Sequence, residues 1–180
     1  SFYQPYHRVL RMLFTTRHRD FGAASLVDCH SMPSSAGHKD ERPRPEFVLG
    51  DRYGTSCTGV VAETVEKALR SVGYTVSRNK PYAGGFITEH YGNPAAGLHA
   101  IQLEINRALY MDEKRYMRVS GFDRLASDLE TVARRLGELP LEALRPYRAA
   151  AERSKKNGRP GKRPKSTGET PKASTGIAPH

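Results

Sequence analysis

The sequence has few cysteines and no long apolar run, and each shortage excludes a class of protein. Its 180 residues contain two cysteines, Cys29 and Cys57, too few for the disulfide framework of a small secreted domain. No apolar stretch approaches the length that crosses a membrane, and the segment Ser-Phe-Tyr-Gln-Pro at the start is unlike a signal peptide. We therefore expect a reduced, cytoplasmic protein without a membrane partner.

The glycine motifs that hold nucleotide phosphates are also missing. The sequence contains neither G-x-G-x-x-G after a strand nor G-x-x-x-x-G-K-[ST]. Gly84, Gly85, Gly92 and Gly97 do cluster, and such glycines let the backbone approach a ligand or adopt positive φ. Nucleotide binding is therefore not indicated.

Positive charge is abundant but unevenly placed. The formal net charge is +10, yet residues 151–180 alone hold eight Lys and Arg against two Glu. This tail has almost no apolar side chains and no aromatic residue for stacking on bases. We expect a folded domain over residues 1–150 and a disordered basic tail over 151–180, and the composition of the tail favours a solvated extension over a nucleic-acid contact.

Within residues 1–150, hydrophobic periodicity predicts alternating helices and strands. Such alternation is typical of an α/β domain with a mostly parallel sheet. Val9, Leu10, Leu13 and Phe14 share one face of the first predicted helix. The predicted helices cover residues 5–19, 60–72, 122–136 and 141–151, and the predicted strands cover 24–29, 47–49, 74–76 and 98–105.

The first predicted strand, which we expect to be buried, ends in two side chains that suit a metal site. Asp28 and His30 are two residues apart, so they face the same side of a strand. His30 could be a metal ligand with Asp28 behind it orienting the ring, or a histidine that only caps the strand. Cys29 points to the opposite face, which excludes a Cys29–His30 nucleophile pair and predicts a small core residue.

A carboxylate lies in the middle of the last predicted strand. Alternation places Gln102 and Glu104 on one face and Ile101, Leu103 and Ile105 on the other. A carboxylate at such a position is paired or lies at a site, because burying a lone charge is costly. Glu104 could be a general base, or it could form an ion pair with Arg107.

Two further histidines, His90 and His99, flank a turn-rich segment. Each could be a ligand, a substrate contact or a structural histidine, and the pattern leaves these alternatives open.

Taken in order, several blocks of the sequence resemble the N-formylglutamate amidohydrolase family. The resemblance covers about residues 3–137 and is specific in the combination of blocks. The blocks are Pro5-Tyr-His7, Leu26-Val-Asp-Cys-His-Ser-Met-Pro-Ser34, Val48-Leu-Gly-Asp-Arg52, Gly54-Thr-Ser-Cys57, Pro81-Tyr-Ala-Gly-Gly-Phe-Ile-Thr88, His90-Tyr-Gly-Asn-Pro94 and the stretch from His99 to Glu113.

This resemblance implies a three-layer α/β/α fold with a mostly parallel or mixed sheet, similar to zinc carboxypeptidases, and a single zinc. It implies that His30 is a zinc ligand, that Asp28 lies behind it and that Glu104 is the catalytic glutamate. Substrate contacts are expected at Arg52, Arg107, His90 and Tyr91. The implied reaction is hydrolysis of N-formyl-L-glutamate in histidine breakdown, so the expected partner is a small N-acyl amino acid.

The family also has an N-terminal segment with further zinc ligands, which has no counterpart in this chain. Since a catalytic zinc usually has about three protein ligands, the chain is expected to be a fragment or to have a degenerate site. A non-catalytic binding module without metal is the alternative function, and nucleic-acid binding through the tail is another. The sequence does not indicate an oligomeric state.

Overall fold

The computed structural model describes residues 2–35 and 44–146. The predicted domain boundary at residue 150 and the predicted disordered tail lie outside these residues, as does the suggested nucleic-acid contact of the tail. Within the described residues, no helix is long and apolar enough to cross a membrane.

Four strands form the main sheet, and its directions are mixed. The strands are β1 (Ala24–Met32), β2 (Phe47–Gly50), β3 (Val76–Arg78) and β4 (Leu98–Asn106). Their spatial order is β1-β4-β2-β3, where β1 pairs with β4 and β2 with β3 in parallel, while β2 and β4 run antiparallel. The prediction of a mostly parallel or mixed sheet is confirmed. A short hairpin of β5 (Met111–Asp112) and β6 (Met117–Arg118) follows.

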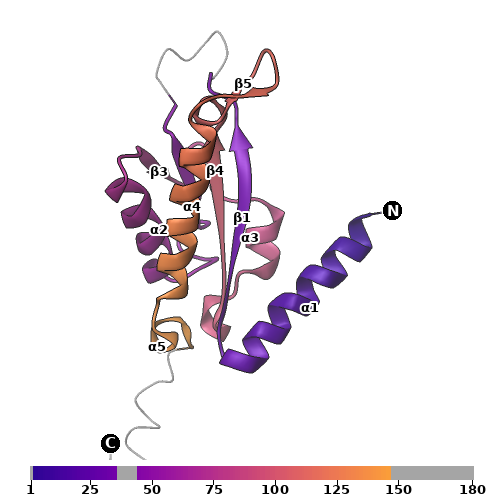
Figure 1. The fold of residues 1–180 in the computed structure, drawn as a ribbon. Coiled ribbons are helices and arrows are strands. Elements are labelled where there is room, and N and C mark those ends of the chain that lie inside the picture. Colours follow the sequence, from indigo (N-terminus) through magenta and orange to yellow (C-terminus); the bar gives the residue numbers. More distant parts are fainter. Residues whose placement is uncertain (1, 36–43, 147–180) are drawn as a thin grey trace, which may run out of the picture. The chain divides into compact units, whose positions relative to one another are not determined.

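Helices flank both faces of this sheet, as Figure 1 shows. The helices α2 (Gly59–Ser71), α4 (Phe122–Gly137) and α5 (Leu141–Leu144) pack with Ile101, Leu103 and Ile105 of β4 in the larger core. On the opposite face, α1 (Tyr3–Phe21) and α3 (Phe86–Tyr91) enclose a smaller core around Phe14, Tyr91 and Ala100. Single 3₁₀ turns occur at Pro94–Ala96 and Arg107–Leu109. The three-layer α/β/α expectation is therefore confirmed.

Strand β1 differs from its prediction in length and burial. It continues to Met32, so that Asp28 and His30 lie within the strand rather than at its end. Because β1 is the edge strand beside β4, Ser25, Val27 and Cys29 on one of its faces are exposed. The expectation of a buried strand with Cys29 in the core was wrong for this reason.

Two helices also differ from their predictions. The last predicted helix ends at Leu144, because Arg145 precedes Pro146 and adopts an extended conformation. In α1, Phe14 is buried, whereas Val9 and Leu13 are about half exposed. The apolar face predicted for α1 is thus only partly covered by the described residues.

Candidate functional site

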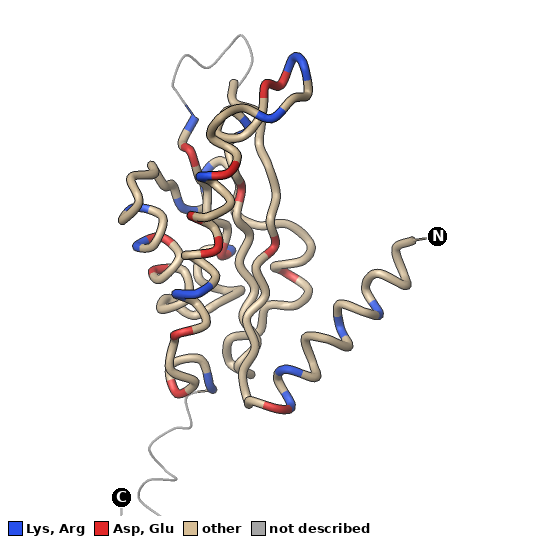
Figure 2. The backbone as a smooth tube through the Cα atoms, viewed as in Figure 1, with Lys and Arg blue, Asp and Glu red and all other residues tan. Residues whose placement is uncertain are grey.

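The candidate site is built on the face of the sheet that carries α3. Figure 2 marks Asp and Glu positions in red, and few of them lie among the central strands. Glu104 lies in β4. The register places Glu104 opposite His30 and Gln102 opposite Asp28 on adjacent parallel strands. Side chains at paired positions point to the same face, so four polar groups meet there. The alternation predicted for Gln102 and Glu104 is confirmed, because both lie on the face opposite Ile101 and Leu103.

Glu104 is held by a buried line of hydrogen bonds. The Nε2 of Gln102 donates to Oε1 of Glu104 at 2.7 Å, and the backbone N–H of Gly85 donates to Oε1 of Gln102 at 2.7 Å. Gln102 and Glu104 are 4% and 6% exposed. Since the Gly85 N–H donates, it needs the amide oxygen of Gln102 as its acceptor, and this leaves the amide nitrogen of Gln102 facing Glu104. The carboxylate therefore receives a donor of fixed orientation.

The imidazole of His30 lies between two carboxylates. Its Nε2 is 3.1 Å from Oδ2 of Asp28, and its Nδ1 is 3.7 Å from Oε1 of Glu104. The His30 side chain is about half exposed, while both carboxylates are mostly buried. An imidazole held at one nitrogen by a carboxylate presents the other nitrogen in a defined direction, as metal-binding histidines do.

This donor set fits a metal only in part. Among residues 2–35 and 44–146, no group of three or more His, Cys, Asp or Glu side chains is arranged to hold a metal ion. His30 provides one imidazole nitrogen with Asp28 placed to orient it, and Glu104 faces the same space. The described residues thus supply one ligand of the usual kind and the carboxylate beside it.

The arginines predicted to bind substrate are already engaged with the protein. Arg52 donates to the carbonyl of Gly84 at 3.1 Å and lies 3.3 Å from Glu89. Arg107 donates to the hydroxyl of Ser31 at 3.2 Å and lies 3.7 Å from Glu113. Both side chains remain about one third exposed. Each arginine is therefore bound to the protein but still partly open to solvent.

Glu113 fixes the segment that follows β1. Its carboxylate accepts hydrogen bonds from the hydroxyl and from the backbone N–H of Ser34. These bonds, with the nearby Arg107, hold the pKa of the Glu113 carboxyl below its usual value. Glu113 thereby ties the segment after β1 to the turn between β5 and β6.

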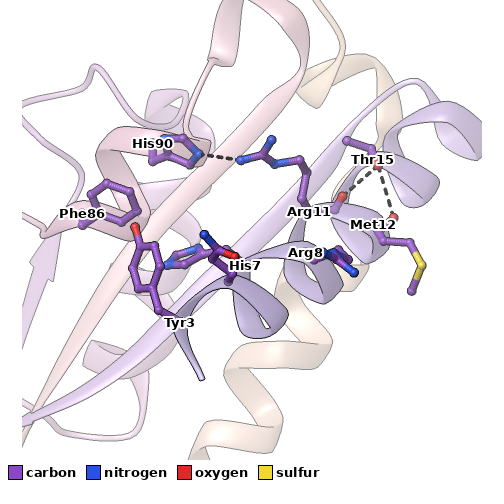
Figure 3. Close-up of a pocket in the computed structure, with 9 residues that line it drawn as sticks. Tyr3, His7, Arg8, Arg11, Met12, Thr15, Phe86 and His90 are labelled. Atoms are coloured by element: carbon purple, nitrogen blue, oxygen red, sulfur yellow. Dashed lines mark hydrogen bonds between the residues drawn. The ribbon is translucent and has the colours of Figure 1, made fainter. Parts of the chain in front are cut away.

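Helix α3 places His90 and Tyr91 in different environments. Tyr91 is buried, and its hydroxyl lies 2.8 Å from Nδ1 of His7. The ring of His90 stacks on Phe86, and its Nε2 lies 3.3 Å from a guanidinium nitrogen of Arg11. His90 lines a cavity between α1 and α3, shown in Figure 3. His90 is thus the more accessible of the two for a ligand.

His99 is a structural histidine of the larger core. It is fully buried, its Nε2 donates to the carbonyl of Leu144 at 2.7 Å, and its Nδ1 accepts from the backbone N–H of Thr58 at 3.3 Å. Burial lowers its pKa below the ordinary histidine value, so the neutral ring is favoured. With both ring nitrogens in use, the reading of His99 as a ligand is excluded in this conformation. Burial likewise raises the pKa of the Cys57 thiol to about 12, against a nucleophilic role.

Two contributors to the site were missed from the sequence. Gln102 could have been recognised, because it shares a strand face with Glu104 two residues away. The Gly85 N–H could not, because the glycine-rich segment reaches β4 only through the tertiary fold. Of the clustered glycines expected to approach a ligand or adopt positive φ, Gly84 and Gly97 have positive φ, at 111° and 78°. Gly85 packs against Gln102, because a Cβ there would lie 3.3 Å from its Oε1.

Known proteins resemble the part of the chain that contains this site. The chain is 39% identical over 112 residues to an N-formylglutamate deformylase of Pseudomonas putida, which is 62% of this chain and 42% of that protein. It is 38% identical over 111 residues to the N-formylglutamate deformylase of Pseudomonas aeruginosa, again 42% of that protein. The chain therefore spans less than half the length of these relatives.

A solved structure shows the same arrangement of elements. The crystal structure of an N-formylglutamate amidohydrolase from Ralstonia eutropha JMP134 superimposes with a TM-score of 0.69 at 39% identity. The match covers 75% of this chain and 51% of that one. The family described as N-formylglutamate amidohydrolase matches residues 1–111, which include β1, β4 and every residue of the Gly85–Gln102–Glu104–His30 cluster. The chain belongs to the N-formylglutamate amidohydrolase family.

Proposed function

We propose that this chain takes part in the hydrolysis of the formyl amide of N-formyl-L-glutamate, releasing formate and glutamate. The observation that supports this most is the buried Gly85–Gln102–Glu104 line beside His30, which presents an oriented carboxylate next to an imidazole. Relatives named as N-formylglutamate deformylases support the substrate. The proposed metabolic pathway is histidine breakdown, and the proposed location is the cytoplasm.

Glu104 would act as the proton carrier of this reaction. As water adds to the formyl carbon, Glu104 takes a proton from it, and the C–N bond breaks as the same proton passes to the leaving amine. Gln102 keeps Oε1 of Glu104 in place during both transfers. The partly exposed side chains of Arg52 and Arg107 suit one substrate carboxylate, since the planar fork matches two oxygens.

The proposed cofactor is zinc, with His30 as one of its ligands and Asp28 orienting the His30 ring. When bound, zinc would supply Lewis acidity that polarises the formyl carbonyl. The further ligands that a catalytic zinc usually has would come from outside the described residues.

Zinc content and formate release, measured on the same preparation, test this function. We expect about one zinc per chain, as in the single-metal hydrolases, together with formate release from N-formyl-L-glutamate. In His30→Ala, both should fall, because the metal loses a ligand, whereas His18→Ala on α1 should change neither. Formate release that persists in a zinc-free sample would exclude zinc, and a zinc-loaded sample without formate release would exclude the reaction for this chain.

Gln102 offers a second test, by its effect on turnover. Methionine at position 102 fills a similar volume but donates no hydrogen bond to Glu104. We expect Gln102→Met to lower kcat by about tenfold, in keeping with the loss of one charge-assisted hydrogen bond. KM should change little, because Gln102 is buried and does not reach the substrate. Gln102→Glu, which turns a carboxylate toward Glu104, should lower kcat further; an unchanged kcat in both variants would contradict the role of Gln102.

A binding module without metal is the second candidate function. It is favoured by the single imidazole at the site, where a catalytic zinc usually has about three protein ligands. Such a module would bind N-formyl-L-glutamate without stoichiometric zinc, so the same zinc measurement separates the two functions.

A further inference from the structure

A cavity of about 540 Å³ lies between α1 and α3, on the same side of the sheet as Glu104. Its size is in the range that accommodates small organic molecules. Figure 3 shows Arg11 reaching from α1 across to His90 on α3, with Tyr3, His7 and Phe86 beside them. The residues that line the cavity are Tyr3, Gln4, His7, Arg8, Arg11, Met12, Thr15, Phe86 and His90.

The charged side chains that line this cavity are positive. Arg8 and Arg11 are one helical turn apart on α1, so the two side chains leave the helix at neighbouring positions. None of the described residues that line the cavity is Asp or Glu. Two arginines without a lining carboxylate favour an anion, and a guanidinium matches a carboxylate in geometry.

The other walls of the cavity suit a short carbon chain. The rings of Phe86 and His90 are stacked 4.9 Å apart, and the ring of Tyr3 lies 6.4 Å from that of Phe86. A guanidinium only donates, so the 3.3 Å contact from Arg11 makes Nε2 of His90 the acceptor and leaves the ring hydrogen on Nδ1. The cavity thus combines the aromatic rings of Tyr3, Phe86 and His90 with the hydrogen-bond donors of its arginines.

The cavity is also joined to the candidate site by the start of α3. Phe86 follows Gly85 directly, and the Gly85 N–H bonds Gln102, which in turn bonds Glu104. Phe86 thus lines the cavity, while its neighbour Gly85 belongs to the candidate site. This continuity argues for a part of the substrate rather than for an unrelated ligand.

We propose that this cavity binds the side-chain carboxylate of an acidic N-acyl amino acid, with Arg8 and Arg11 as its cationic contacts. The inference rests on the proposed function for its substrate, and it explains how an acidic side chain is preferred over a neutral one. The carboxylate bonds the guanidinium groups, and the methylenes of the side chain lie along Phe86 and Tyr3.

Binding of glutarate, a dicarboxylate without an amide to hydrolyse, tests the site independently of catalysis. Side-chain NMR signals of His7 and His90 should shift saturably with glutarate in the wild type and in Arg17→Gln, a variant of an α1 arginine outside this cavity. In Arg8→Gln/Arg11→Gln, the affinity should fall by about tenfold or more, as expected for lost charge-assisted bonds. The unshifted remainder of each spectrum shows that the variant is folded.

The activity of the same variants separates this proposal from the proposed function. With N-formyl-L-glutamate the double variant should show a higher KM, whereas with N-formyl-L-glutamine its KM should equal that of the wild type. Equal glutarate affinity in wild type and double variant would overturn the cavity proposal even if formate is released. Arginine-dependent glutarate binding without formate release would support the cavity and refute the reaction.

Discussion

Replacing Glu104 by Gln is expected to lower kcat for formate release by about 10²- to 10⁴-fold, the usual contribution of a general acid–base group. Glutamine keeps the size of the side chain and its bond from Gln102, but it cannot accept the proton of the attacking water. KM should change much less than kcat. The measurement is initial rates of formate release over a range of N-formyl-L-glutamate concentrations.

A surface glutamate provides the control for this substitution. Glu63→Gln removes an exposed carboxylate on α2 that pairs with Lys67, and it should leave kcat unchanged. If Glu104→Gln retained most of the wild-type kcat while Glu63→Gln behaved as expected, another group would be the proton carrier. Asp28, which lies on the same face beside His30, would then be the next carboxylate to replace.

The second large effect is on stability and concerns Gly50 at the end of β2. A Cβ at this position would lie 2.5 Å from the backbone nitrogen of Gly84 and 2.7 Å from the carbonyl carbon of Ala83. Because both neighbours are backbone atoms, no side chain can rotate away. We expect Gly50→Ala to lower the free energy of unfolding by about 3 kcal/mol, as overpacking in a core does. Chemical denaturation followed by circular dichroism measures this change.

Gly137 offers the matched glycine-to-alanine control. It ends α4, and a Cβ there would meet no atom within 4 Å. Gly137→Ala should raise the free energy of unfolding by about 0.5–1 kcal/mol, because alanine loses less conformational entropy in a helix. An equal loss in both variants would mean that the contact between Gly50 and Gly84 does not determine the effect.

The stability effect at Gly50 should also reach the site. The segment from Ala83 to Gly85 that would be displaced is the one whose N–H fixes Gln102. Folded Gly50→Ala protein should therefore show a lower kcat as well as a lower midpoint of unfolding.

Short-range patterns predicted the central part of this fold. The alternation in β4 gave its two faces, and the helix predicted over residues 60–72 forms as α2, with Val61, Val65 and Leu69 in the core. Both periodicities depend only on neighbours along the chain. The pairing partners of each strand depend on the whole topology. This is why the antiparallel pairing of β2 with β4 and the exposed face of β1 were not foreseen.

The candidate site was predictable to a similar extent. Asp28, His30 and Glu104 were singled out by their place in strands, and the register brings these three together. The cavity beside His90 needs residues from α1 and α3 that are more than seventy positions apart, as the 79-residue separation of Arg11 and His90 shows. No local pattern indicates such a meeting, because it arises only when both helices pack on the same face of the sheet.

The edge position of β1 has a dynamic consequence for the site. Glu104 lies on β4, which has a strand on each side, whereas His30 lies on β1, which among the described strands pairs only with β4. Edge strands open at lower free energy than central ones, so the amides of β1 should exchange with deuterium faster than those of β4. A ligand that contacts both His30 and Glu104 would connect the two strands. Slower deuterium exchange of the β1 amides would then detect ligand binding without any chemical turnover.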